Sequence, residues 1–155
     1  MFFFFKPMKL QENKNIDIAS VEVYDFIIHE LTPEGLSRVI NGTKAYIYKD
    51  TYNIINVNYT DASDNKISNI VAKKGIYKDR IITLKGDVKY TRDDNIVLES
   101  QSLTYDEKNS ILTTNDRYIM YNAQNKITGT SFKLNNKLEK VYSKNVHITY
   151  NIEDN

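Results

Sequence analysis

The chain has 155 residues, a length that suits a single domain able to bury a modest core. It contains 21 basic and 20 acidic residues, so the net charge of +1 provides no overall field that favours nucleic acid as a partner. The absence of cysteine excludes a disulfide scaffold and cysteine-ligated metal sites.

The N-terminal segment is an apolar run, Met1 to Phe5, that ends at Lys6 and Pro7. A membrane-spanning helix needs about 20 apolar residues, so this run alone is too short to cross a bilayer. A signal peptide carries its positive charge before the apolar run, whereas Lys6 follows it. We interpret 1–7 as the remnant of an N-terminal membrane anchor. The alternative is a start feature whose phenylalanines pack elsewhere.

The polar stretch 8–19 is predicted to be a linker, and 20–155 a single β domain. Twelve tyrosines, six phenylalanines and many β-branched residues favour strands over helices. The first strand is Val21–Phe26, followed by a turn around Pro33 and Gly35. Further strands are predicted at 36–40, 44–48, 52–59, 66–72, 75–77, 81–84, 87–91, 96–100, 102–105, 111–114, 118–121, 126–129, 131–134, 140–142 and 146–150.

A repeat of about 30 residues runs through most of this domain. Each copy contains a short apolar stretch, a polar turn, a second apolar run and a closing Asn or Asp. The copies are Ala45 to Val57, Ile76 to Val88, Thr104 to Asp116 and Lys133 to Val146. Such a unit cannot bury its apolar face alone, so the copies should stack into an elongated β structure with a continuous interior.

Period-2 alternation predicts which side chains point inward. The inward set is Ile55, Val57, Tyr59, Val88, Tyr90, Ile96, Leu98, Phe132, Leu134, Val146, Ile148 and Tyr150. Residues between them, such as Asn56, Lys89 and His147, should face outward. Each inward residue taken alone is an ordinary core residue. Together they predict an apolar face that could hold an acyl chain if the two sheets part.

No catalytic or metal-binding constellation is present in the sequence. The two histidines, His29 and His147, are too far apart to suggest a triad or a metal site. The segment Asp61 to Lys66 lacks the glycine of a calcium loop, and Asp93-Asp94 lies in a polar turn. We therefore predict no enzyme activity, no cofactor and no metal.

Several short motifs together carry a resemblance to a known family. They are Tyr24-Asp25-Phe26, Thr32-Pro33-Glu34-Gly35-Leu36, Ala72-Lys73-Lys74-Gly75-Ile76-Tyr77, Ile82-Thr83-Leu84-Lys85-Gly86-Asp87-Val88, Leu98-Glu99-Ser100-Gln101-Ser102-Leu103, Lys126-Ile127-Thr128-Gly129-Thr130-Ser131-Phe132 and Val146-His147-Ile148-Thr149-Tyr150. In their order and spacing, over about Val21 to Glu153, they resemble the LptC family, the bridging component of the Gram-negative lipopolysaccharide exporter.

The resemblance implies an elongated, twisted, open β-jellyroll of two antiparallel sheets on the periplasmic side of the inner membrane. One N-terminal helix would anchor it, with Phe2 to Phe5 as the last turn. Lipopolysaccharide would be the ligand, its acyl chains lying in an apolar groove. The implied groove residues are Val57, Tyr59, Ile70, Leu84, Val88, Leu98, Leu103, Phe132, Leu134, Val146 and Ile148.

The implied partners lie at opposite edges of the sheet. LptF/LptG-type transporter subunits would meet the N-terminal edge at Val21, Val23 and Phe26. An LptA-type bridge protein would meet the C-terminal edge. The residues expected there are Gly129, Val146, Ile148 and Tyr150. Bare strand edges recruit further strands, which favours joining by strand addition.

Two other interpretations stay open at this point. The first is a free periplasmic bridge of the LptA type, without an anchor. The second is a β-sandwich carbohydrate-binding module, which would need exposed aromatic residues on one flat face.

Overall fold

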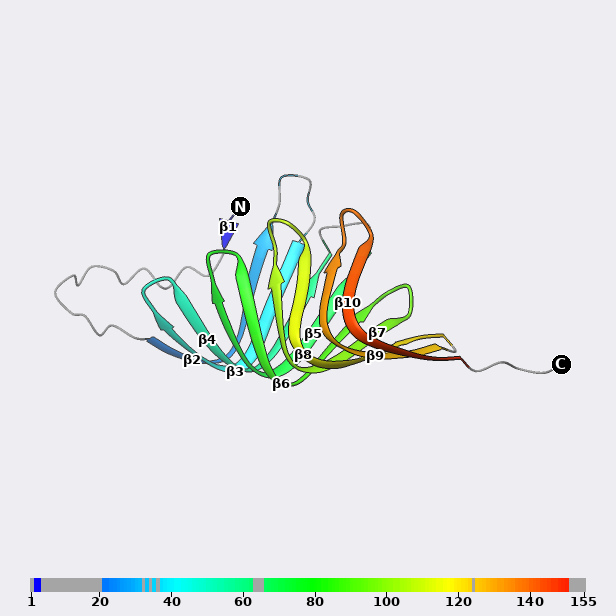
Figure 1. The fold of residues 1–155 in the computed structure, drawn as a ribbon. Helices are drawn as coiled ribbons and strands as arrows, with labels where there is room; N and C mark the ends of the chain where they lie inside the picture. The colour runs from blue at the N-terminus through cyan, green and yellow to red at the C-terminus, as the bar shows by residue number, and fades with distance from the viewer. Residues whose placement is uncertain are drawn as a thin grey trace.

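The computed structural model describes residues 2–3, 21–31, 33, 35, 37–62, 66–123 and 125–150, and every regular element in that part of the chain is a β-strand. The strands are β1 (Phe2–Phe3), β2 (Val21–Leu31), β3 (Ser37–Tyr48), β4 (Thr51–Asp61), β5 (Ser68–Lys78), β6 (Ile81–Arg92), β7 (Ile96–Asp106), β8 (Ile111–Asn122), β9 (Asn125–Asn135) and β10 (Lys140–Tyr150). They form one antiparallel sheet in which each strand pairs with its neighbours in sequence (Figure 1).

Each long strand bends near its middle, so the single sheet folds into two layers (Figure 1). On β2, β4, β6 and β10 the bend lies at a residue with left-handed φ: Asp25, Asn56, Asp87 and Asn145. Asn and Asp adopt this conformation more readily than other non-glycine residues. The pairing register is interrupted along the same line between β5 and β10. The predicted all-β, elongated fold is confirmed, and its two layers are halves of one sheet.

We call the two layers by their position relative to the bend. The first layer contains 21–24, 44–55, 74–85, 102–114 and 131–142. The second layer contains 26–31, 37–42, 57–61, 68–72, 88–100, 117–129 and 146–150. Each sequence repeat is one hairpin of the first layer. The Asn or Asp that closes the repeat is a bend residue in three of the four copies, namely Asn56, Asp87 and Asn145.

The core lies between the layers and consists mainly of two rows of side chains in cross-strand register. The second-layer row is Ile28, Ile40, Tyr59, Ile70, Tyr90, Leu98, Met120, Ile127 and Ile148. The first-layer row is Ile47, Tyr52, Tyr77, Ile82, Tyr105, Leu112, Leu134 and Val141. A single apolar cluster thus runs across the sheet.

The bend corrects one predicted orientation. Ile54 is buried and Ile55 is half-buried on the outer face, paired with Lys44 and Lys74 on its two sides. The prediction that Ile55 points inward was wrong, because the left-handed residue Asn56 shifts the inward alternation by one position before Val57. The inward positions of Val57, Tyr59 and the outward position of Asn56 are confirmed.

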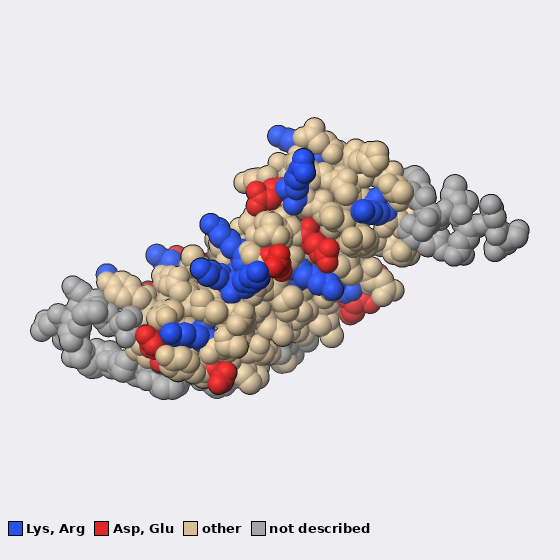
Figure 2. Space-filling model, turned by 90° about the horizontal axis from the view of Figure 1, so that it is seen from below, with Lys and Arg blue, Asp and Glu red and all other residues tan. Residues whose placement is uncertain are grey.

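The outer surface carries charges of both signs. The face in Figure 2 shows lysine and arginine interspersed with aspartate and glutamate. One contributing ion pair joins Lys73 and Asp87 at 3.0 Å on the outside of the bend. This mixture fits a solvated face better than an electrostatic footprint for nucleic acid.

Candidate functional site

The interior is closed in the middle of the sheet and open at its C-terminal end. In the second-layer row, Tyr59 and Tyr90 are completely buried, whereas Ile148 is 45% exposed. In the first-layer row, Leu112 is completely buried and Val141 is 50% exposed. The apolar interior therefore reaches the surface along β10.

The predicted groove residues divide between these two environments. Nine of them are buried in the common core: Val57, Tyr59, Ile70, Leu84, Val88, Leu98, Leu103, Phe132 and Leu134. Val146 and Ile148 are exposed on β10. The structure thus brings nine of the eleven predicted residues into one buried core, and the other two are exposed on the C-terminal strand.

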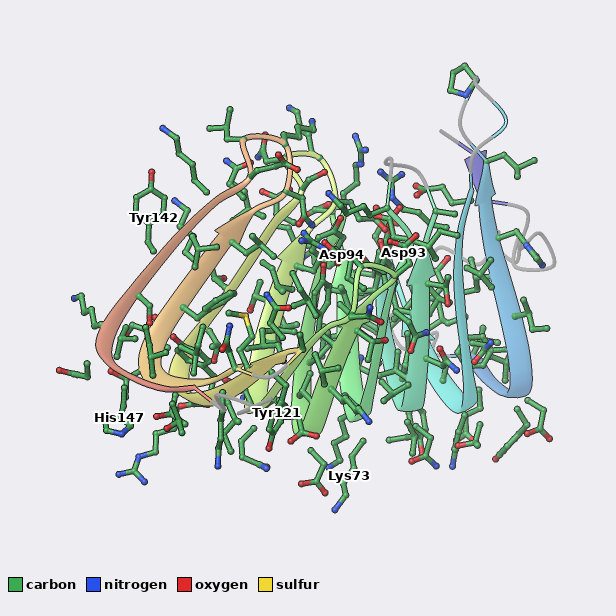
Figure 3. All side chains as sticks on the ribbon, turned by 90° about the vertical axis from the view of Figure 1, so that its right-hand side faces the viewer. Lys73, Asp93, Asp94, Tyr121, Tyr142 and His147 are labelled. Carbon is green, nitrogen blue, oxygen red and sulfur yellow. The ribbon has the colours of Figure 1, made fainter. Side chains whose placement is uncertain are left out.

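The C-terminal edge of the sheet is an uncovered strand. β10 is last in the strand order and pairs with β9 on one side only, within the part of the chain described. It exposes the apolar side chains of Val141, Tyr142, Val146 and Ile148. Tyr142 and His147 point away from the interior (Figure 3). The backbone of Tyr150 pairs with Asn125. The edge has the unpaired backbone groups that strand addition requires.

Gly129 lies close to the backbone of β10 and to the Tyr118 side chain near this edge. It is buried on β9, and a Cβ atom there would lie 2.9 Å from the carbonyl oxygen of Lys144 and 2.9 Å from the Tyr118 hydroxyl. The Tyr118 hydroxyl in turn lies 2.6 Å from Ser143 Oγ on β10. Any side chain at position 129 would therefore push against the bend of β10.

Apart from the two-residue β1, the N-terminal edge is formed by β2, where Val21 and Val23 are half-buried and Phe26 belongs to the core. The neighbouring Tyr24 and Ile27 are 60% and 57% exposed. The backbone of Phe2–Phe3 pairs with Glu30 and Leu31 at one end of β2. Phe4, Phe5 and the predicted linker lie outside the described residues, and the anchor at 1–7 stays a prediction.

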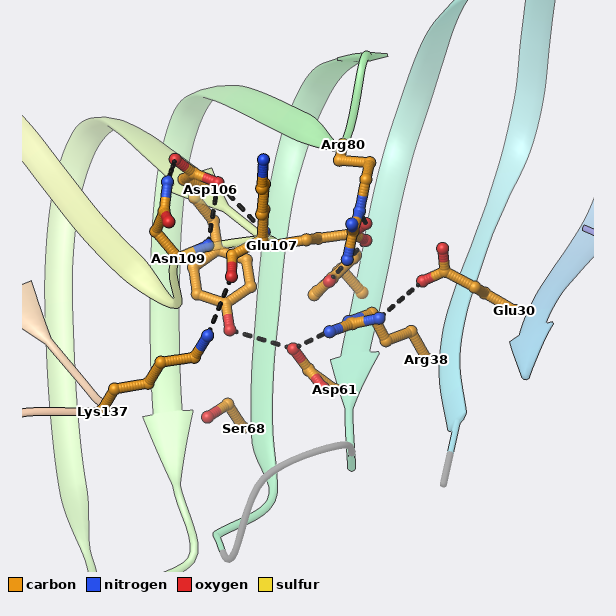
Figure 4. A network of polar contacts seen from close by, with 12 residues as sticks. Glu30, Arg38, Asp61, Ser68, Arg80, Asp106, Glu107, Asn109 and Lys137 are labelled. Carbon is orange, nitrogen blue, oxygen red and sulfur yellow. Dashed lines mark hydrogen bonds and ion pairs between the residues drawn. The ribbon is translucent and has the colours of Figure 1, made fainter. Parts of the chain in front are cut away.

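Sequence reasoning missed a buried polar seam that joins the layers at the ends of the strands, opposite the bend (Figure 4). We define the seam as Glu30, Arg38, Tyr59, Asp61, Tyr77, Tyr105 and Glu107. Its acidic residues and Arg38 are at most 7% exposed. The available signal was a Tyr-x-acid pattern that occurs at Tyr59-Thr60-Asp61 and at Tyr105-Asp106-Glu107.

The seam contains a reciprocal exchange of hydrogen bonds between the two layers. Tyr59 of the second layer donates to Glu107 at 2.8 Å, and Tyr105 of the first layer donates to Asp61 at 2.9 Å. The two rings meet edge-on, with centroids 5.8 Å apart. Tyr77 donates to the other oxygen of Glu107 at 2.8 Å.

Arg38 extends the seam toward β2. Its Nη1 donates to Glu30 at 2.9 Å and its Nε donates to Asp61 at 3.2 Å. The seam nevertheless leaves two buried polar atoms without a hydrogen bond, Oε2 of Glu30 and Nε of Arg80. Arg80 Nε lies 3.9 Å from the Glu107 carboxylate, which is an ion-pair distance only.

Burial raises the pKa of the Glu107 carboxyl to about 7, and the negative charge of Glu30 adds to this effect. The hydrogen bonds from Tyr77 and Tyr59 act in the opposite direction, as does the charge of Arg38. Burial, with the charge of Glu107 adding to it, also raises the pKa values of the Tyr59 and Tyr77 hydroxyls. Both tyrosines therefore keep their protons near neutral pH.

His29 and His147 are both exposed. Within the described ranges, no group of three or more potential ligands converges to hold a metal ion. The same ranges contain no helix with the length and hydropathy to cross a membrane.

A family model described as "LptC: Lipopolysaccharide-assembly, LptC-related" matches residues 6–151. The search of curated proteins found no match.

Proposed function

Since the chain belongs to the LptC-related family of lipopolysaccharide assembly, we propose that it receives lipopolysaccharide from the inner-membrane transporter and passes it to a periplasmic bridge protein. The family acts in transport as a component of the periplasmic bridge of the cell envelope. No chemistry on the lipid is needed for this role, because the chain would only provide an apolar path.

The observation that carries the proposal is the opening of both apolar rows at β10. Val141 ends one row and Ile148 ends the other, and both are about half exposed. A partner that adds a strand to β10 would continue the two rows into its own interior. An acyl chain could then move from one protein to the next without entering water, which would otherwise cost about 0.8 kcal/mol for each CH₂ exposed.

The N-terminal edge is proposed to meet LptF/LptG-type transporter subunits. Val21 and Val23 are half-buried on β2, Val23 packs against the core, and Tyr24 and Ile27 expose apolar surface on the same strand. If 1–7 is the end of a membrane anchor, the linker 8–19 spans at most about 40 Å. This tether would hold the β2 edge close to the bilayer.

Cross-linking on β10 tests the proposed lipid path with a matched control. Ile148 ends the second-layer row, and the adjacent His147 points away from the interior (Figure 3). A photoreactive amino acid at position 148 should form an adduct with lipopolysaccharide, whereas the same amino acid at position 147 should not. Equal labelling at the two positions would contradict an interior path.

The free-bridge alternative shares the lipid path and differs only in the anchor. Fractionation of the cells that make the protein separates the two. Recovery with the inner membrane supports the tethered role, and recovery in the soluble periplasmic fraction supports an LptA-type bridge.

A further inference from the structure

The central interior is sealed from solvent in the closed structure. Ile82, Leu84, Tyr59 and Tyr90 are completely buried, and Leu98 is 1% exposed. Close-packed interiors contain few voids larger than a water molecule. A lipid that passes from the β2 side to the β10 side must therefore move the two layers apart over β4 to β7.

The polar seam holds these layers together at the end where they would part. Tyr59 and Asp61 come from β4 in the second layer, whereas Tyr105 is the next-to-last residue of β7 in the first layer and Glu107 lies in the turn after the strand. Each pair supplies one donor and one acceptor to the other pair. We call these four residues the latch. Because the bend is at the opposite side of the layers, the layers would part from the end that contains the latch.

We propose that the latch is a lateral gate that must open before the acyl chains of the lipid can enter the central interior, while the β10 end stays accessible with the latch closed. The inference rests on the proposed function and adds to it the place where passage is controlled.

The chemistry of the latch suits reversible opening. Water would solvate the two carboxyl groups, the hydroxyl groups and the buried atoms Glu30 Oε2 and Arg80 Nε, which lack hydrogen bonds when the layers are closed. Burial of carboxyl and hydroxyl groups has a desolvation cost that burial of apolar residues of similar volume does not have. An apolar seam would hold the layers more firmly, so a polar seam lowers the cost of parting them.

A photoreactive lipid can locate the barrier without altering the packed core. The probe is a lipid A-type glycolipid with a diazirine at the end of one acyl chain, and adducts are mapped by proteolysis and mass spectrometry. With the unmodified chain, adducts should concentrate on the open end, at Met120, Ile127 and Ile148. Central residues such as Ile70 and Leu98 should be labelled weakly.

The variant Tyr59→Phe/Tyr105→Phe removes both hydroxyl donors and keeps both rings. It leaves Glu107 and Asp61 short of donors in a buried place, so the open population should rise by roughly tenfold or more. Labelling at Ile70 and Leu98 should increase with it. The matched control is Tyr90→Phe, because the Tyr90 hydroxyl lies 3.1 Å from Ser68 within one layer. This control should leave central labelling unchanged.

Amide hydrogen exchange provides a second readout that needs no lipid. In the double variant, exchange should accelerate at the seam ends of β4 and β7 while β9 keeps its rate, which also shows that the chain remains folded. Strong central labelling of the unmodified chain, or an unchanged central signal in the folded double variant, would overturn the gate. Absence of labelling at every interior position would instead overturn the proposed function, and the gate with it.

Discussion

Glu107 is the residue on which both layers converge. Its carboxyl group is 2% exposed and accepts hydrogen bonds from Tyr59 and Tyr77. The charged groups nearest to it are Glu30, Arg38 and Arg80. Because burial raises its pKa to about 7, the folded state binds this proton more tightly than the unfolded chain does.

This raised pKa predicts a pH-dependent stability. The contribution of Glu107 is fully present below its unfolded pKa of about 4.3 and is lost as pH rises through the folded value of about 7. The free energy of unfolding should therefore fall between pH 5 and 7.5, by an amount on the order of 2–3 kcal/mol. Urea unfolding at several pH values measures the slope.

The control for this slope is Glu107→Gln, which keeps an acceptor oxygen and does not titrate. Its unfolding free energy should vary much less over the same pH range. The pKa values of the Asp87 and Asp94 carboxyl groups are lowered, so these groups titrate at lower pH than this range. In that lower range they make the free energy of unfolding rise with pH, which is opposite in sign to the effect of Glu107. An identical slope in both proteins would assign the effect to another group.

Gly129 is the second residue whose environment gives a sharp prediction. In Gly129→Arg, the new Cβ would meet the Lys144 carbonyl oxygen and the Tyr118 ring at 2.9–3.0 Å. The free energy of unfolding should fall by about 2–4 kcal/mol, and β10 should lose its alignment. Thermal unfolding measures the first effect, and hydrogen exchange of β10 measures the second.

Thr128→Arg is the matched control, since Thr128 is the adjacent residue on β9 and lies on the other face, opposite His147. The Thr128→Arg variant should change the melting temperature little and leave the rate of amide hydrogen exchange in β10 unchanged. If the two variants behave alike, steric pressure on β10 is not the cause.

At the residue level, the sequence predicted most inward positions and missed the consequences of the bends. Val88, Tyr90, Leu98, Phe132 and Leu134 are buried as predicted. Simple alternation failed at Ile55, because it assumes continuous extended backbone and Asn56 has a φ of 56°. The seam was missed because it depends on residues brought together from β2, β3, β4, β5, β7 and the turn after β7.

At the level of elements, β10 is the strand whose backbone should matter most for docking. Neighbouring amides along a strand point to opposite sides. Proline lacks a backbone N–H group. Of the variants Ile148→Pro and Thr149→Pro, one therefore loses a backbone hydrogen bond to β9, and the other loses an N–H donor on the free edge of β10, away from β9. The variant that keeps its circular dichroism spectrum and melting temperature should be the one that loses capture of the bridge protein.

Pull-down of an LptA-type protein provides the measurement for this pair of variants. His147→Ala serves as a control, because its side chain points away from the interior while its backbone is unchanged. This control should capture the bridge normally. Normal capture by both folded proline variants would place the docking edge elsewhere.

Several strands that are predicted to be separate are continuous in the structure. The sequence pattern predicts one strand at 81–84 and another at 87–91, whereas β6 runs from Ile81 to Arg92. Asp and Asn usually mark turns between strands, and nothing in the local pattern distinguishes a turn from a bend within a strand. The repeat and the apolar alternation were sufficient to predict the all-β fold class, because both patterns are present on each side of the bend.

For the whole molecule, burial predicts a gradient of local stability. Both rows are buried across β5 to β7, whereas Met120 on β8 and Ile127 on β9 are partly buried, and the row members on β10 are exposed. Amides in the middle of the sheet should exchange slowly, and those of β10 should exchange fastest among the paired strands. Addition of the bridge protein should slow β10 specifically. Equal protection from amide hydrogen exchange in all strands would contradict an interior that is open to solvent at β10.

The strictly sequential strand order has a consequence for size. Adjacent strands lie about 4.8 Å apart, so each repeat of two strands lengthens the sheet by roughly 10 Å. The radius of a globular domain grows only with about the 0.38 power of its residue number. Here, by contrast, the span increases in direct proportion to the number of repeats. Insertion or loss of one repeat would change the length of the protein across its strands by a fixed step and leave its cross-section unaltered.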